Sequence, residues 1–328
     1  MASPRVRRYG LAATCVFLAC IALASGCKTS DDATAAASQL TATAKGLTDY
    51  YSALDTILGE TDQLYTIQGA LVAAAPYDAA TRGLVMNTRA EIKKREAIAA
   101  SLTTLAQSFA RLAGSTAPAD VAASASNLET EVASIKPIGT TMNSEEQNLM
   151  KIAIESLVKA VQEHKEREAA KAIEIFTGAL TTFFATEEPD CNSIGESYVA
   201  VSRSMAIYLV KHGQTDPSDL LKVVFDPYSL TAHVTDAGFK AKILTIAEQQ
   251  INQKADALEA AQKSAGNSME ESLKEMVARI HTVADDKPMS VRTPPVTLSN
   301  VEKWSADILG APSTHAAAPA SAVPASQK

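Results

Sequence analysis

The residues best suited to chemistry in this chain are five histidines and four cysteines, since imidazole and thiolate groups bind metals and act as bases or nucleophiles. The histidines are His164, His212, His233, His281 and His315. None of them has a glutamate three residues before it, so the Glu-x-x-His signature of a di-iron bundle is missing. The sequence also contains no His-Glu-x-x-His and no Cys-x-x-Cys motif. The spacing therefore predicts no metal site.

Two of these histidines have a local explanation. His212 stands in Lys211-His212-Gly213, where a cation and a glycine suit a helix C-terminus. His164 lies near the buried register of a predicted helix, inside the charged segment 162–168. A polar layer or a flared helix edge explains His164, and a metal-binding or pH-sensing role is the alternative.

Nucleophile and phosphate motifs give no better evidence for an enzyme. Ser156 and Lys159 form a Ser-x-x-Lys pattern, but the Ser-Asp-Asn and Lys-Thr-Gly partners of the β-lactamase pattern are absent from the body of the chain. No Gly-x-Gly-x-x-Gly, Walker A or Gly-x-Ser-x-Gly motif occurs. We therefore expect no catalytic residue, no cofactor and no enzyme activity. A site whose residues meet only in the folded chain is the alternative that a sequence leaves open.

Three of the four cysteines fall at the amino terminus. A basic start with no acid precedes the apolar run 11–24, which has the length of the central region of a signal peptide. This run is shorter than the roughly 20 apolar residues that a membrane-spanning helix needs. Cys15 and Cys20 lie inside it, and Cys27 follows the small residues Ser25 and Gly26. Small residues at this place are typical of a signal-peptide cleavage site.

The residues Ala24-Ser25-Gly26-Cys27 resemble the lipobox of bacterial lipoproteins. The resemblance covers residues 1–28 only, and it departs from the family at Ala24, where leucine is preferred. It implies that the Cys27 thiol carries a diacylglyceryl group through a thioether. It also implies that the signal peptide is cut between Gly26 and Cys27 and that the new amino group is acylated. An ordinary cleaved signal peptide, with a cysteine there by chance, is the alternative.

The resemblance also bears on location. Lipoproteins of this family that stay in the inner membrane commonly carry aspartate directly after the cysteine, and this chain has Lys28. The resemblance therefore implies an exported protein anchored in the outer membrane, facing the periplasm or the cell surface. Cys191 is then the one remaining thiol, so it cannot form an intramolecular disulfide. We expect Cys191 to be buried near a helix start, with an intermolecular bond as the alternative.

The charge of the chain excludes one class of partner. The formal net charge is −7, and removal of residues 1–26 takes away three arginines and no acid, which leaves −10. An acidic body has no general attraction for the phosphates of nucleic acids. We therefore expect no nucleic-acid partner.

Apolar spacing predicts a chain made of long helices. Leu40, Leu47 and Leu54 repeat every seven residues, which places one apolar stripe on a helix that ends before Pro76. Asp78 is a candidate cap for the next helix, and Ser144 with Gln147 is a candidate capping box. The predicted helices are 39–75, 78–112, a shorter one around 121–135, 143–185, 194–211, a short one after Asp216-Pro217, 239–284 with a possible division at 266–268, and 298–309.

The fold class that follows is all-α, an elongated antiparallel bundle, because no alternating strand pattern occurs. Helices of about 35 residues are about 50 Å long at 1.5 Å per residue. We expect four parts: a cleaved signal peptide at 1–26, the lipidated cysteine and a flexible tether at 27–38, the bundle at 39–309, and a disordered Ala/Pro-rich tail at 310–328. The bundle has a possible division into two subdomains near 137–143.

These observations favour a lipid-anchored, non-enzymatic bundle of the bacterial cell envelope that acts as a binding or scaffold protein. Its partners are then the membrane, through the lipid anchor, and an envelope protein or a second copy of the chain. The alternative is a membrane-active bundle, since residues 175–185 form an uncharged apolar segment. That segment is too short to span a bilayer as a helix, and a place in the bundle core also explains it.

Overall fold

The computed structural model describes residues 8–72, 77–112, 118–138, 144–163, 165–214, 217–231, 233–285 and 298–310, with the backbone alone for 8–34. These residues form helices and contain no strand, which confirms the all-α fold class. The helices are α1 (Arg8–Leu71), α2 (Ala79–Leu112), α3 (Pro118–Ser134), α4 (Ser144–Gln162), α5 (Glu166–Lys211), α6 (Lys222–Phe225), α7 (Ala237–Ala284) and α8 (Ser299–Leu309), with 3₁₀ turns at Pro217–Leu221 and Asp226–Tyr228.

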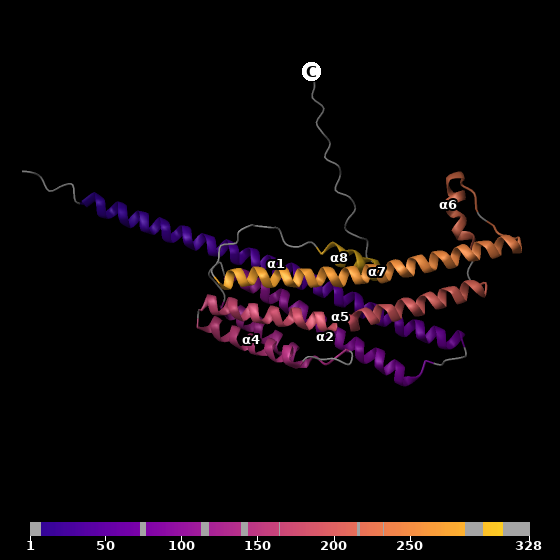
Figure 1. Cartoon of the computed structure of the whole chain (residues 1–328), viewed down its shortest axis with the longest axis horizontal. Coiled ribbons are helices and arrows are strands. Elements are labelled where there is room, and N and C mark those ends of the chain that lie inside the picture. Colours follow the sequence, from indigo (N-terminus) through magenta and orange to yellow (C-terminus); the bar gives the residue numbers. More distant parts are fainter. Residues whose placement is uncertain are drawn as a thin grey trace, which may run out of the picture.

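The long helices lie side by side and give the protein an elongated shape (Figure 1). The helix α1 packs against α2, α5, α7 and α8, while α5 also contacts α4 and α7. The helices α3 and α4 pack on each other beside α2 and α5. The carboxy-terminal ends of α1 and α5 and the helix α6 lie at the same end of the bundle, which we call the distal end (Figure 1). There the Tyr208 hydroxyl of α5 donates to the Leu71 carbonyl of α1 over 3.4 Å.

The predicted leucine stripe forms the spine of the core, because Leu40, Leu47 and Leu54 are all buried. The helix begins earlier than we expected, however. Residues 28–38, interpreted as a tether, belong to α1, and Ala36 and Ala37 are each only 1% exposed. Residues 28–38 are rich in polar side chains but also contain several alanines, and alanine is the residue that favours helices most. The division considered near 137–143 does not interrupt the core, since residues from both sides belong to one buried cluster.

The largest error in element bounds concerns α4 and α5. We expected one helix over 143–185 and another over 194–211. The structure instead ends α4 at Gln162 and begins α5 at Glu166, inside the charged segment that has no apolar face to bury. The helix α5 then runs through Pro189, which costs it one backbone hydrogen bond. Buried residues on either side, Glu187 and Cys191, hold the helix together there.

The expected buried faces were partly wrong. The apolar spacing of 143–185 predicts that Leu149 and Ile152 are buried, but they are 41% and 57% exposed, because the buried face of α4 runs through Met150, Ile154 and Leu157. Leu84 is also exposed on α2. Gln147 donates its side-chain amide to the Val132 carbonyl over 2.6 Å and makes no capping box with Ser144. The helix α7 is continuous across 266–268, so the division considered there is absent.

The predicted helix ends at Asp78 and Lys211 are confirmed. Asp78 accepts a 2.7 Å hydrogen bond from the Thr81 amide. The His212 amide donates to the Tyr208 carbonyl at the end of α5, and Gly213 follows with a φ of 67°. A positive φ of this size suits glycine, which has no Cβ to clash.

Two glycines inside α5 make a matched test of this packing. Gly178→Ala should stabilise the protein by about 0.5–1 kcal/mol, because a Cβ there meets nothing within 4 Å and alanine is the better helix former. Gly195→Ala should destabilise it by about 1–3 kcal/mol, since its Cβ would lie 1.5 Å from the buried Gln262 amide. Urea unfolding of the purified variants measures both changes. Equal effects of the two substitutions would contradict the packing described.

Candidate functional site

The most concentrated polar chemistry lies inside the bundle, between Arg95 of α2 and Glu187 of α5. Arg95 Nε donates to Glu187 Oε2 over 2.6 Å, and Arg95 Nη2 donates to Glu187 Oε1. The same guanidinium also donates to the Glu91 and Lys136 carbonyls over 2.9 Å. The two side chains are 1% and 2% exposed, so this is a fully buried ion pair.

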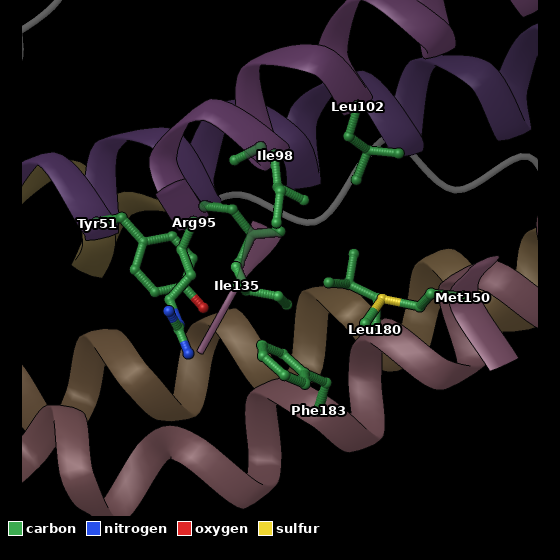
Figure 2. A pocket seen from close by; sticks show the side chains of 10 residues that line it. Tyr51, Arg95, Ile98, Leu102, Ile135, Met150, Leu180 and Phe183 are labelled. Carbon is green, nitrogen blue, oxygen red and sulfur yellow. The ribbon is translucent and has the colours of Figure 1, made fainter. Parts of the chain in front are cut away.

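The surroundings of the pair are apolar. Figure 2 shows the Arg95 guanidinium beside Tyr51 and Phe183, and its central carbon lies 5.5 Å from the Phe183 ring centroid. The adjoining cavity has a volume of about 10 Å³, which is room for roughly one water molecule. Burial raises the pKa of Glu187 above its ordinary value, although the hydrogen bonds and charge of Arg95 oppose the shift. The hydrogen bonds of Arg95 can hold α2, α3 and α5 together. The cavity beside the pair is too small for a substrate.

Cys191 lies one turn beyond Glu187 on the same helix. Its side chain is 1% exposed, which confirms the expected burial, but it lies in the middle of α5 rather than near a helix start. Burial raises the pKa of the Cys191 thiol far above its ordinary value. A thiol without an accessible thiolate form is a poor nucleophile and a poor metal ligand.

The histidines are scattered over the bundle. His164 and His315 lie outside the described residues, and His233 is exposed between α6 and α7. His212 Nδ1 donates to the Tyr208 carbonyl over 2.8 Å, at the end of α5. Sequence reasoning missed the partner of His281, whose Nδ1 lies 2.6 Å from Glu174 Oε1 of α5. The two residues are far apart in the chain, and no local pattern signals their contact.

Other motif residues remain separate. Ser156 and Lys159 are exposed on α4. In the part of the chain that the structure describes, no group of three or more His, Cys, Asp and Glu side chains is placed to hold a metal ion.

The apolar segment 175–185 packs in the core through Phe176, Leu180 and Phe183. Cys27 belongs to α1, and its side chain is outside the described residues. The described helices include none that is apolar over a membrane-spanning length.

Five exposed apolar side chains lie on the segment that runs from α6 into the first turns of α7, at the distal end. We call them the α6–α7 surface, and they are Val224, Tyr228, Leu230, Phe239 and Ile246. Each of these five side chains is between 46% and 74% exposed. Phe239 and Ile246 are seven residues apart and so share one face of α7. Both residues keep the helical apolar spacing of 239–284, and such spacing alone does not distinguish a core face from an exposed one. Grouped exposed apolar side chains are typical of interaction sites.

Comparison of the chain with protein-family models, curated proteins and solved structures finds no match. Its function is therefore inferred from its own residues and geometry.

The buried pair gives a stability prediction. Arg95→Met should lower the free energy of unfolding by about 3–5 kcal/mol, because it leaves the Glu187 carboxylate buried without its partner. Arg203→Met is the control, since Arg203 of α5 pairs with the exposed Asp256 at the surface and should contribute about 1 kcal/mol or less. Urea unfolding at pH 7 measures both. A loss for Arg95→Met no larger than the loss for Arg203→Met would contradict the central role of the pair.

The same variant should respond to pH. Without Arg95, only the effects that raise the Glu187 pKa remain, so the native state keeps a proton that the unfolded state releases. Stability of Arg95→Met should therefore fall as the pH rises through the folded-state pKa and recover as the pH is lowered toward the ordinary glutamate value of 4.5. Urea midpoints of the variant and the wild type, measured from about pH 5 to about pH 8, test the direction of this change in stability. A penalty that stays constant over the whole range would contradict it.

The burial of Cys191 gives a reactivity prediction. In protein that lacks residues 1–26 and carries Cys27→Ser, Cys191 is the one thiol left. It should react with a chromogenic disulfide reagent only after unfolding in urea, because burial both shields the thiol and suppresses the thiolate. A Ser156→Cys variant, exposed on α4, should add one thiol that reacts at once. Rapid labelling of the folded parent protein would show that Cys191 is accessible.

Proposed function

We propose that the protein is a lipid-anchored, non-enzymatic helical bundle of the bacterial cell envelope that binds a protein partner. The observation that carries the proposal is the position of Cys27, directly after Ser25-Gly26 at the end of an apolar run. Two or three acyl chains on one residue hold a protein on a membrane stably, whereas one chain does so only marginally. Lys28 favours the outer membrane as the anchored membrane.

The shape of the bundle supports a binding role away from that membrane. The helix α1 continues from Cys27 to Leu71 at the distal end. At 1.5 Å per residue this length corresponds to about 65 Å. The amino-terminal part of α1 and the helix α6 lie at opposite ends of the molecule (Figure 1). Such an arrangement presents the α6–α7 surface to a partner in the periplasm, or outside the cell if the anchor faces outward.

The chemistry of the interior is consistent with binding rather than turnover. The Arg95–Glu187 pair is saturated, and Cys191 is enclosed in the core. The exposed groups of the distal end include apolar side chains of the kind that protein interfaces bury at their centres. We infer that the partner contributes an apolar patch to this surface.

A membrane-active bundle is the second candidate. The same five exposed side chains of the α6–α7 surface favour it, since they could also enter the interface of a lipid bilayer. Dye release from liposomes separates the two functions. Release that is abolished by Phe239→Asp would support membrane activity, and intact liposomes would support the binding protein.

Lipid anchoring is tested by replacing Cys27. The wild-type protein should lose residues 1–26, take up a labelled fatty acid and fractionate with membranes. Cys27→Ser should remain uncut and unlabelled, because the acyl acceptor is gone. Cys20→Ser, inside the apolar run, is the control and should behave as the wild type. A Cys27→Ser protein that is still cut at the same place and still bound to membranes would refute the lipobox assignment.

A further inference from the structure

The segment that carries the α6–α7 surface is attached to the bundle through α7 alone. The 3₁₀ turn Pro217–Leu221 packs against α7, and no other long helix of the described chain makes a substantial contact with this turn or with α6. Figure 1 shows α6 standing off the long helices at the distal end. Along the first turns of α7, Ile243 and Ala247 are buried whereas Phe239 and Ile246 are exposed. This part of α7 therefore packs on one face and leaves the other face open.

The backbone before α7 holds two of the exposed side chains in place. Ser229 has a φ of 53° and is the one non-glycine residue with a positive φ among the described residues. Its amide donates to the Asp226 carbonyl over 3.0 Å, and the Leu230 amide donates to the Phe225 carbonyl over 3.2 Å. This pair of hydrogen bonds around a left-handed residue is a common way to end a helix. Tyr228 and Leu230, on either side of Ser229, are 74% and 59% exposed. Side chains presented by an ordered backbone lose less freedom on binding.

Two lysines accompany the apolar side chains on α7. Lys240 and Lys242 are both exposed, and neither makes an ion pair among the described residues. Lys242 is three residues from Phe239 and four from Ile246, so it shares their face of the helix. Residues 237–247 contain no acid. The open face of α7 therefore combines apolar side chains with unpaired positive charge.

The charge of this segment is opposite in sign to that of the rest of the protein. Residues 222–247 contain three lysines and two aspartates, which gives +1 with histidine neutral, whereas the chain without residues 1–26 has 27 basic and 37 acidic residues, which gives −10. One of the two acids, Asp236, accepts a 2.7 Å hydrogen bond from the Phe239 amide at the start of α7. Its charge is thereby directed at the helix amino terminus. The next acid along α7, Glu248, lies 3.5 Å from the Lys211 ammonium of α5.

We propose that the partner of the α6–α7 surface is a protein that presents carboxylates beside an apolar patch, and that Lys240 and Lys242 bind these carboxylates. This inference rests on the proposed function and names the chemistry of the partner at the same site. The apolar side chains supply buried contact area, and the lysines supply selectivity, because opposite charges steer a partner into place while like charges reject it. An anionic membrane is the less suitable occupant, since recognition of lipid surfaces uses clusters of about four to eight basic residues. This segment has three, in a protein of strongly negative charge.

Photo-crosslinking in living cells tests the inference, with a photoreactive phenylalanine analogue in place of Tyr228 in the full-length protein. The segment of the partner that is captured should contain an excess of Asp and Glu over Lys and Arg when it is sequenced by mass spectrometry. Lys240→Glu/Lys242→Glu should reduce the amount of captured protein at least about tenfold, because like charges then face each other. The control Lys171→Glu/Lys303→Glu changes the net charge equally at exposed positions on α5 and α8 and should leave capture unchanged.

The possible results separate this inference from the proposed function. Capture that survives the reversal of Lys240 and Lys242, equal losses in the control, or a captured segment without an excess of acid would overturn the acidic partner and leave a binding protein. No captured protein with any variant, or cross-links to lipid alone, would overturn both. Lys240→Gln/Lys242→Gln removes the charges without reversing them and should give a smaller loss in the same direction. Urea unfolding of each variant checks that the bundle stays folded.

Discussion

The buried pair of Arg95 and Glu187 is the constraint on which the rest of the bundle depends. A guanidinium and a carboxylate inside an apolar core are tolerated only when each satisfies the other and the remaining donors find acceptors. Arg95 meets this condition with Glu187 of α5, the Glu91 carbonyl of its own helix and the Lys136 carbonyl that follows α3. One side chain thereby fixes three elements at a single height along the bundle. Any sliding of α2 against α5 would break both charged hydrogen bonds between Arg95 and Glu187 at once.

A second polar layer fixes the relation between α1 and α7. The Gln39 amide donates to Thr43 and to Ser272 of α7, and the two hydroxyls of Thr43 and Ser272 lie 2.8 Å apart. Between the two layers the core is apolar and rich in leucine and alanine. Apolar stripes alone allow helices to shift by one turn, whereas buried hydrogen bonds specify one register. This rigidity suits the proposed function, since α1 then holds the distal end at a fixed distance from the lipid anchor.

The sequence predicted well what is local and periodic. The heptad of Leu40, Leu47 and Leu54, the cap at Asp78 and the glycine at the end of α5 each depend on a few neighbouring residues. The failures have a common cause, which is that tertiary contacts decided the outcome. Pro189 stays inside a helix because its neighbours are buried in the core, and Phe239 stays exposed because none of the described helices covers that face of α7.

The polar contacts of the candidate sites were beyond sequence reasoning for the same reason. Arg95 and Glu187 lie on different helices far apart in the chain, and the charged residues around each of them look like an ordinary solvated face. The pairing of His281 with Glu174 is of the same kind. Cys27 is the opposite case, because its proposed role rests on adjacent residues that a sequence shows directly.

The central claim is that the distal end of a lipid-anchored bundle binds a protein partner. The most direct measurement is photo-crosslinking in living cells, with a photoreactive amino acid placed at Phe239 of the full-length protein and, as a control, at the exposed Glu155 of α4. Our interpretation predicts that Phe239 captures one envelope protein at a roughly one-to-one ratio, as expected for a specific interface, and that Glu155 does not. Cross-links from Phe239 to lipid alone, or the same products from both positions, would contradict it.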